Sequence, residues 1–425
     1  MSFSDLVDDI NAMLEGAEPP STGDCCIYKV PSKIRKLNAD AYTPTVVSIG
    51  PFHHGHPQLQ NMEPQKLIHF KAFLQRTEAC LNDLVCYVDS ILSNFKRCYS
   101  ETLPFSHDEL VKLILIDSGF IIELFLRYHY GGFVFELWFD DGITTNLMLL
   151  ENQLPFFVIE KIYSLSFSST NASNPNTMIP CFLELTINFF FSFNKSNLFF
   201  DDGDISIRHF TDLIRIFHLQ HPFENRPGRI DIKDINIGEW MLHLPSATEL
   251  LEAGVKFKVN TKSKCLLDLR FSGEVLEIPS LIVEDRTEAL FRNMVALEQF
   301  HYTNKLYITD YVSVLDYLIN TGKDVDILVH KEILENWLGD SDSVANLFNG
   351  LCINVVHTNI SSQFSILCKD LNAFCRNPWH KLKATLRRDY GKTPWQAAAS
   401  FAGIVLLVLT FIQSVCSVLQ VVQAS

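Results

Sequence analysis

The sequence predicts a mainly α (α+β) protein: a multi-helix globular body with a small antiparallel β element and one C-terminal transmembrane helix. The helical body is indicated by apolar residues that recur at three- and four-residue steps over much of the chain. The β element is indicated by short runs that alternate with a period of two residues. The terminal helix is indicated by the lack of any charged side chain after Lys392.

The chain is predicted to divide into four parts. Residues 1–24 form a polar, flexible leader. Residues 25–220 form the N-terminal helical part of the body, and residues 221–392 form a C-terminal α+β part that closes with a basic juxtamembrane stretch. Residues 393–425 form the membrane anchor and a short tail.

In the N-terminal part, prolines and β-branched residues predict an extended chain over residues 27–51. Ser106 and Glu109 form a capping box at the start of one helix. Pro155 is expected to kink or restart another helix. The predicted helical stretches are 63–95, 106–131, 145–162, 181–191 and 207–218.

In the C-terminal part, Ser246 and Glu249 form a second capping box, and Gly254 ends that short helix. Ser272 and Gly273 are expected to form a turn between strands. A further helical series begins at Thr287 and reaches about residue 388. The predicted strands are 255–259, 266–271 and 275–278.

The last part of the chain is predicted to cross a membrane, because roughly 20 apolar residues span a hydrocarbon core of about 30 Å. Basic residues are concentrated just before it and none follows. This asymmetry predicts a single-pass plasma-membrane protein with a cytosolic body and its C-terminus on the far side. The residues chosen to mark the span are Ala397, Phe401, Val405, Leu409, Ile412 and Val418.

Two alternatives to this topology remain open. The tail could instead be a buried C-terminal helix of a globular protein. An inverted topology would place the body outside, where the glycosylation sequons at Asn171, Asn194 and Asn359 become usable. In the main interpretation, the lipid bilayer is the partner of the terminal helix.

Charge and motif content exclude several function classes. The formal net charge of −14 repels a phosphate backbone, so nucleic acid is not expected as a partner. The sequence has neither a phosphate-binding glycine loop nor a nucleophile elbow. The 11 cysteines are scattered and predict reduced thiols, not a metal centre or a disulfide framework. No cofactor is therefore predicted.

Two clusters of polar residues stand out as candidates for chemistry. His53, His54 and His56 surround Gly55 and offer imidazoles for zinc or copper; the alternative is a structural turn. Glu151, Asn152 and Gln153 lie in an apolar segment, where unpaired polar groups are costly. They form either a carboxylate site for acid–base catalysis or a buried hydrogen-bond network that includes Arg35, and Glu123 and Asp117 could join it.

Ordered strings of residues resemble a plant protein family known as domain of unknown function 247. Leu149–Phe157 is similar to its most recognisable string, and Asp117–Glu123 is similar to another with two residues in variant order. The other strings are Val30-Pro31, Arg35, Asn38, Ala41-Tyr42, Pro44, Val47–Gly55, Met62-Glu63, Lys66, Ser246–Leu250, Ala253–Phe257, Phe291–Gln299, Leu318–Thr321 and Asp324-Val325. The resemblance covers roughly residues 27 to 420.

The resemblance implies a membrane-associated plant protein with no established activity. Some members are implicated in grass self-incompatibility and others in stress or defence, and an outward-facing body has been suggested for recognition roles. The residues that match family motifs, and to which a structural role is assigned, are Arg35, Gly50, His53, His54, Gly55, Glu123, Glu151, Asn152, Gln153, Glu249, Gly254, Asn293 and Glu298.

These observations predict a membrane-tethered, non-catalytic protein that acts in recognition or signalling by binding partner proteins. The alternative is an uncharacterised enzyme that uses Glu151 or the histidines at 53–56. A structure discriminates between them, because catalytic side chains must line an open pocket and not be sealed beneath packed apolar residues.

Overall fold

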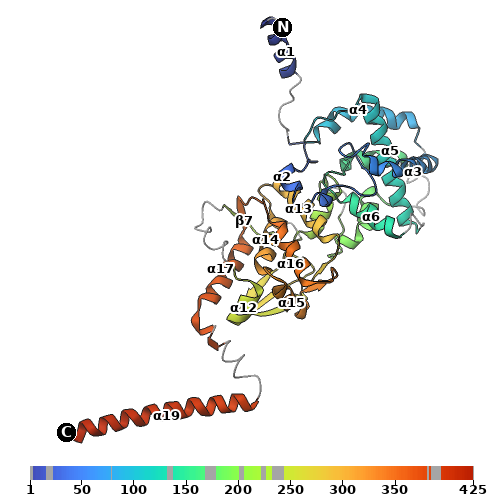
Figure 1. The fold of residues 1–425 in the computed structure, drawn as a ribbon. Helices are drawn as coiled ribbons and strands as arrows, with labels where there is room; N and C mark the ends of the chain where they lie inside the picture. Colours follow the sequence, from blue (N-terminus) through green and yellow to red (C-terminus); the bar gives the residue numbers. More distant parts are fainter. Residues whose placement is uncertain are drawn as a thin grey trace.

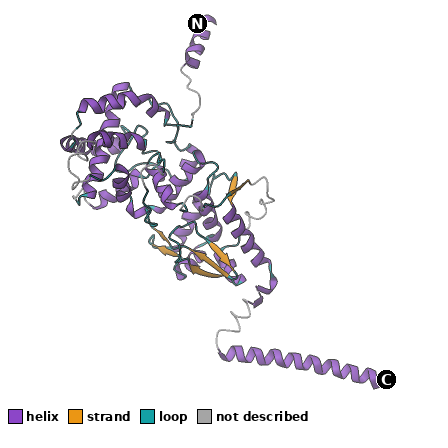
Figure 2. Cartoon of the chain, turned by 180° about the vertical axis from the view of Figure 1, so that it is seen from behind, coloured by secondary structure: helices purple, strands orange, loops and turns teal. Residues whose placement is uncertain are grey.

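The computed structural model describes residues 3–15, 23–77, 79–131, 137–167, 179–200, 205–221, 226–231, 244–380, 382–383 and 394–424. The described chain is mainly helical, as predicted. Figure 1 shows most of its helices gathered into an N-terminal and a C-terminal half, with the first and the last helix lying apart from them. One large apolar cluster runs through both halves, from Ile27 to Phe374. The strands lie in the C-terminal half (Figure 2).

The helices of the N-terminal half are α1 (Phe3–Glu15), α2 (Ser32–Arg35), α3 (Glu63–Arg76), α4 (Leu81–Arg97), α5 (His107–His129), α6 (Leu137–Leu147), α7 (Phe156–Phe167), α9 (Phe182–Phe189) and α10 (Phe210–His218). Short 3-10 helices are η1 (Asp40–Tyr42), η2 (Pro57–Met62) and η3 (Phe191–Phe193). Helix α1 lies within the predicted flexible leader.

The helices of the C-terminal half are α12 (Ala247–Ala253), α13 (Thr287–Phe300), α14 (Tyr307–Leu318), α15 (Gly322–His330), α16 (Ser341–Leu351) and α17 (Ser362–Arg376), followed by α19 (Pro394–Ala424). The strands are β1 (Arg229–Asp231), β2 (Lys256–Val259), β3 (Arg270–Ser272), β4 (Val275–Ile278), β5 (Leu281–Val283), β6 (Leu334–Asn336) and β7 (Asn359–Ser361).

Helix α5 is the centre of the N-terminal half, and α3, α4, α7 and α9 pack around it. The predicted capping box is confirmed: the Ser106 hydroxyl accepts from the Glu109 N–H, and the Glu109 carboxylate accepts from the Ser106 N–H. Gly119 allows α3 to pack closely, because a Cβ there would lie 2.3 Å from the Phe70 ring. The second capping box and the left-handed Gly254 at the end of α12 are also confirmed.

Two predicted helices are wrong in extent. The stretch 63–95 is broken between α3 and α4, where Thr77 is extended and its hydroxyl donates to the Ser166 carbonyl. Within the stretch 145–162, residues 148–155 form a loop between α6 and α7, and α7 begins directly after Pro155, where a kink or restart was predicted. There, the side-chain amides of Asn152 and Gln153 donate to the carbonyls of residues 146, 147 and 149, so those carbonyls are satisfied without further helical turns.

Within the described residues, the strands form three small sheets. Strands β3 and β4 form the predicted antiparallel hairpin, with Gly273 at a positive φ of 64° in its turn. Strand β2 pairs with β4 in parallel, so this sheet is mixed and not purely antiparallel. The predicted strand 266–271 is wrong over most of its length, because pairing begins only at Arg270. Strands β1 and β7 pair antiparallel, and β5 and β6 pair parallel.

The predicted membrane span is wrong: within the described residues, no helix has both the length and the apolar character needed to cross a bilayer. The prediction of a single-pass membrane protein is therefore wrong. In α19 the hydroxyls of Thr410 and Ser414 donate to the carbonyls of Leu406 and Thr410.

Of the six residues predicted to lie in the membrane span, three have described side chains in α19. Val405, Leu409 and Ile412 are exposed to solvent on the helix surface. The side chains of Ala397, Phe401 and Val418 lie outside the described residues. Of the basic stretch, residues 384–393 lie outside the described part, while Lys383 forms an ion pair with Glu274 at 2.7 Å.

Candidate functional site

The loop between α6 and α7 carries the most unusual polar residues of the chain, and all three are fully buried. Asn152 binds the extended chain at residues 47–49: its Oδ1 accepts from the Ile49 N–H at 2.8 Å, and its Nδ2 donates to the Val47 carbonyl at 3.1 Å. Gln153 accepts from the Phe210 N–H at 2.9 Å, at the start of α10. These amides therefore hold three distant segments together.

Glu151 is the best candidate in the sequence for acid–base chemistry, and its surroundings disfavour that role. Its Oε1 accepts from the Val30 N–H at 2.8 Å, while its Oε2 meets the Arg35 guanidinium and lies 3.3 Å from His53 Nε2. Burial raises the pKa of Glu151, but hydrogen bonds from His53, Val30 and Arg35 outweigh burial and lower the pKa below its ordinary value. The carboxylate is ionised at neutral pH and cannot act as a general acid there.

The three histidines at 53–56 do not converge. His53 faces Glu151, whereas His54 is exposed and lies edge-on to the Phe105 ring. His56 precedes η2, and Gly55 between them has a positive φ of 82°. Within the described residues, no three His, Cys, Asp or Glu side chains are arranged to hold a metal ion.

A second buried charge cluster lies under the same extended segment. The Lys66 ammonium, 1% exposed, is 2.6 Å from Asp117 Oδ1 and donates to the Ser48 carbonyl at 2.9 Å. Asp117 Oδ2 accepts from the Gly50 N–H at 2.8 Å, which ties α5 to that segment. Burial raises the pKa of Asp117 despite the Lys66 charge. Lys66 was not predicted as a member of this cluster.

Glu123 does not join either cluster. It lies farther along α5, where its carboxylate pairs with Arg76 at 3.0 Å and with Arg127 at 2.8 Å. This ion triad connects α3 to α5 and involves neither Glu151 nor Asp117.

Two motif residues on α13 connect the halves of the molecule. Asn293 accepts from the Leu150 N–H at 2.8 Å and donates to the Ala41 carbonyl at 2.6 Å. Glu298 is fully buried, accepts from the N–H groups at the start of α14, and pairs with Arg215 of α10 at 2.9 Å. Glu249 serves only as the capping residue of α12.

Asp310 is a buried carboxylate that was not predicted as a site residue. It pairs with Arg229 at 2.6 Å and accepts from the Ser361 N–H at 2.8 Å, so it joins α14 to the small β1–β7 sheet. Burial raises the pKa of Asp310 to about 7. In the sequence, only the position of Asp310 on the inner face of a helix could have indicated that this carboxylate is buried.

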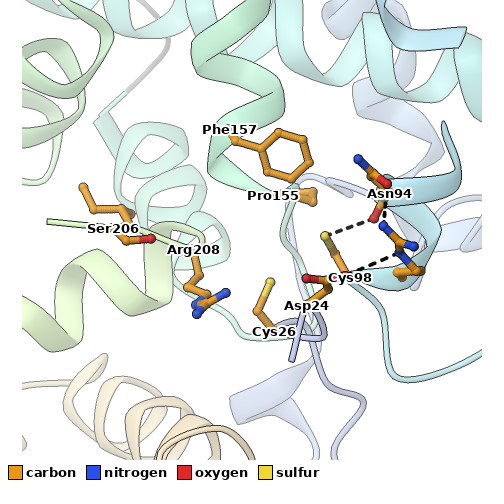
Figure 3. A pocket seen from close by; sticks show the side chains of 10 residues that line it. Asp24, Cys26, Asn94, Cys98, Pro155, Phe157, Ser206 and Arg208 are labelled. Atoms are coloured by element: carbon orange, nitrogen blue, oxygen red, sulfur yellow. Dashed lines mark hydrogen bonds and ion pairs between the residues drawn. The ribbon is translucent and has the colours of Figure 1, made fainter. Parts of the chain in front are cut away.

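An open cavity of about 260 Å³ lies where four chain segments meet (Figure 3). The segments are residues 24–26, the end of α4, the start of α7 and residues 206–208, which precede α10. Arg97 pairs with Asp24 at 3.4 Å on its rim. The sequence could not predict this cavity, because no two of its segments are adjacent in the chain. The lining residues are Asp24, Cys26, Asn94, Arg97, Cys98, Pro155, Phe157, Ser206, Ile207 and Arg208.

A second cavity of about 210 Å³ lies between η3 and the strands β5 and β6. Trp337, which is 60% exposed, stands at its edge, and its indole N–H donates to Glu335 at 2.9 Å. The Arg286 guanidinium lies 4.8 Å from the centre of the Phe193 ring on its wall. Lys195 also lines it, and burial lowers the pKa of that ammonium.

Comparison with known proteins gives a family model, described as plant protein of unknown function, that matches residues 27–409. A UPF0481 protein of Arabidopsis thaliana is 29% identical over 96% of this chain and 88% of its own length. A second UPF0481 protein of the same plant is 24% identical over 91% of this chain and 89% of its own length. No solved structure matches the chain.

Proposed function

Because the chain belongs to the DUF247 family of plant proteins of unknown function, we propose that it is a non-catalytic recognition protein that works by binding another protein. The observation that carries this proposal is that the motif residues hold the fold together. Glu151, Asn152 and Asn293 are buried, and each binds backbone groups of distant segments. Side chains committed to holding the fold are not free to act on a substrate.

The enzyme alternative depends on Glu151 or on the histidines at 53–56. The Glu151 side chain has no exposed surface and a lowered pKa, which weakens it both as an acid and as a base. His53 is turned inward to the same carboxylate, while His54 points to the outside. These placements favour binding over catalysis.

The Trp337 groove, defined as the cavity lined by Phe193, Lys195, Arg286 and Trp337, is the surface we assign to the partner. Large aromatic residues and arginine supply most of the binding energy at protein interfaces. Here Trp337 is exposed beside a hollow that an inserted side chain can fill, and Arg286 and Lys195 can bind its polar groups. The groove is built from strand ends, a 3-10 helix and the start of α13.

The test uses tagged full-length protein expressed in plant tissue and quantitative affinity purification with Trp337→Ala and Trp379→Ala. Trp379 is the matched control, because it is 74% exposed and does not line the groove. We expect a specific set of proteins that wild type and Trp379→Ala recover equally, and that Trp337→Ala recovers at least tenfold less. Equal recovery with both variants, or nothing above an empty-tag control, contradicts the proposal.

A further inference from the structure

Two buried thiols face the 260 Å³ cavity from neighbouring segments. Cys26 is 3% exposed and Cys98 is 6% exposed. The Cys98 carbonyl accepts from the N–H groups of both Cys26, at 3.0 Å, and Ile27, at 2.9 Å. The Ser100 N–H donates back to the Ile27 carbonyl at 3.0 Å, which completes a parallel bridge between Ile27 and Tyr99.

This bridge places the two cysteines in register, one residue before each bridge partner. Neighbouring strands lie about 4.8 Å apart, and a disulfide requires a Cα separation of about 4.4–6.8 Å. Figure 3 shows the side chains of Cys26 and Cys98 next to each other in the cavity. The register of this bridge therefore suits a bond between the two sulfur atoms.

The two thiols have different electrostatic surroundings. A hydrogen bond from the Cys26 thiol lowers the pKa of Cys98, and the nearby Arg208 and Arg97 charges lower it further against the effect of burial. The same hydrogen bond raises the pKa of Cys26, and so does burial. As a thiol, Cys98 donates to the Asn94 carbonyl at 3.4 Å. Cys98 is the thiol that ionises first.

We propose that Cys26 and Cys98 are a peroxide-sensitive thiol pair, in which Cys98 reacts first and Cys26 then closes a disulfide across the cavity wall. The cavity gives a small oxidant access to the sulfur of Cys98. Arg208, which also lines the cavity, favours the anionic form of both sulfur atoms. The oxidant that this chemistry needs is hydrogen peroxide.

The reaction balances as follows. The Cys98 thiolate attacks one oxygen of hydrogen peroxide, the O–O bond breaks, and the departing hydroxide takes up the proton of the original thiol to leave as water. Cys98 is then a sulfenic acid. The Cys26 sulfur attacks the Cys98 sulfur, the S–O bond breaks, and the hydroxyl leaves as a second water with the Cys26 proton. Two thiols lose two electrons to one peroxide.

The disulfide would fasten the segment that contains Cys26 to the end of α4. That segment continues to Val30, whose N–H is held by Glu151. The chain between the two cysteines includes α2, α3 and α4, so the bond closes a long loop and restricts the unfolded chain. We expect the oxidised protein to melt about 5 °C higher than the reduced protein.

The experiment treats the reduced, full-length protein with one equivalent of hydrogen peroxide and maps disulfides by mass spectrometry without reduction. The expected product is a Cys26–Cys98 cross-linked peptide pair that has lost the mass of two hydrogen atoms. In Cys26→Ser, we expect a sulfenic acid at Cys98 that a cyclic diketone captures. In Cys98→Ser, Cys26 should stay reduced.

Cys86→Ser is the matched control, because Cys86 is an exposed thiol on the same helix, α4, and does not line the cavity. It should form the cross-link as fast as wild type does. The proposal is overturned if wild type oxidises Cys86 or Cys80 while Cys26 and Cys98 stay reduced. It is also overturned if Cys98 pairs with Cys25, or if the diketone labels Cys26 in place of Cys98.

Discussion

Glu151 binds two parts of the chain that sequence alone does not bring together. One carboxylate oxygen holds the Val30 N–H, and the other holds Arg35 and His53. A buried ionised group is stable only when all its partners are present, because removal of one leaves the others unpaired. The same logic applies to Lys66 and Asp117.

The first residue-scale prediction is that Glu151→Gln lowers the free energy of unfolding by about 3–5 kcal/mol, since it leaves the Arg35 charge without its carboxylate. Urea unfolding followed by circular dichroism measures the loss. Glu101→Gln is the control, because Glu101 is half exposed and pairs with Lys29 at 3.2 Å. Its expected cost is below about 1 kcal/mol. Equal costs for the two variants would show that the Glu151 contacts contribute little.

The second residue-scale prediction concerns pH. Burial raises the pKa of Asp310 from 3.8 to about 7, so the folded state holds this proton more tightly than the unfolded chain does. Its contribution to stability is fully present below pH 3.8 and is lost as the pH rises through about 7. Each pKa unit corresponds to about 1.4 kcal/mol, which sets an upper limit of about 4 kcal/mol.

Asp310→Asn removes this titration. As the pH is raised from 4 to 8, the free energy of unfolding of the variant should therefore increase relative to that of wild type. Unfolding curves in urea across that range measure the difference between the two proteins. Asp370→Asn, at an exposed carboxylate on α17, should follow wild type at every pH. A constant difference between Asp310→Asn and wild type would mean that Asp310 is already ionised at pH 4.

At the scale of elements, features set by neighbouring residues could be predicted from the sequence, and features set by distant contacts could not. The capping boxes at Ser106 and Ser246 need only a partner three residues away, and both are present. The loop after α6 was predicted as helix, because its apolar pattern is helical. Helix α6 ends here because the side-chain amides of Asn152 and Gln153 donate to its last carbonyls. The oxygens of the same side chains accept from the N–H groups of Ile49 and Phe210.

The strand errors have the same cause. Apolar alternation around Leu266 resembles a strand, but within the described residues strand pairing begins only at Arg270. The predicted membrane span is contradicted by a different finding: within the described residues, no helix is both long and apolar enough to cross a bilayer. The candidate residues were found from their polarity in apolar surroundings, whereas the cavity, Lys66 and Asp310 depend on the packed structure.

The element-scale prediction is that Gly50→Ala is severely destabilising. Gly50 has a positive φ of 72°, and a Cβ there would lie 2.3 Å from the Gln153 carbonyl oxygen. Backbone must move to relieve that clash, so we expect a loss of about 3 kcal/mol or more. Gly55→Ala is the control: φ is 82°, but a Cβ would meet nothing within 4 Å. Its expected cost is about 1 kcal/mol, and differential scanning calorimetry compares the two. Similar melting temperatures would contradict the close approach of these segments.

At the scale of the whole molecule, the motif residues make one body of two halves. Asn293 on α13 holds Leu150 and Ala41, and a small apolar cluster seals the same junction. Glu298 connects α13 to α10 through Arg215. The interior is thus fixed by polar side chains that bind irregular backbone. The Trp337 groove, to which we propose that a partner protein binds, lies on the outer surface.

Hydrogen exchange of the full-length protein, read by mass spectrometry, tests this account most directly. The loop amides of Val30, Ile49, Gly50 and Leu150 lie outside regular helices and strands, yet Glu151, Asn152, Asp117 and Asn293 hold them. We expect these amides to be protected as strongly as those of α5, at the level of global unfolding. Exchange as rapid as that of an exposed loop would contradict the structural role assigned to the motif residues.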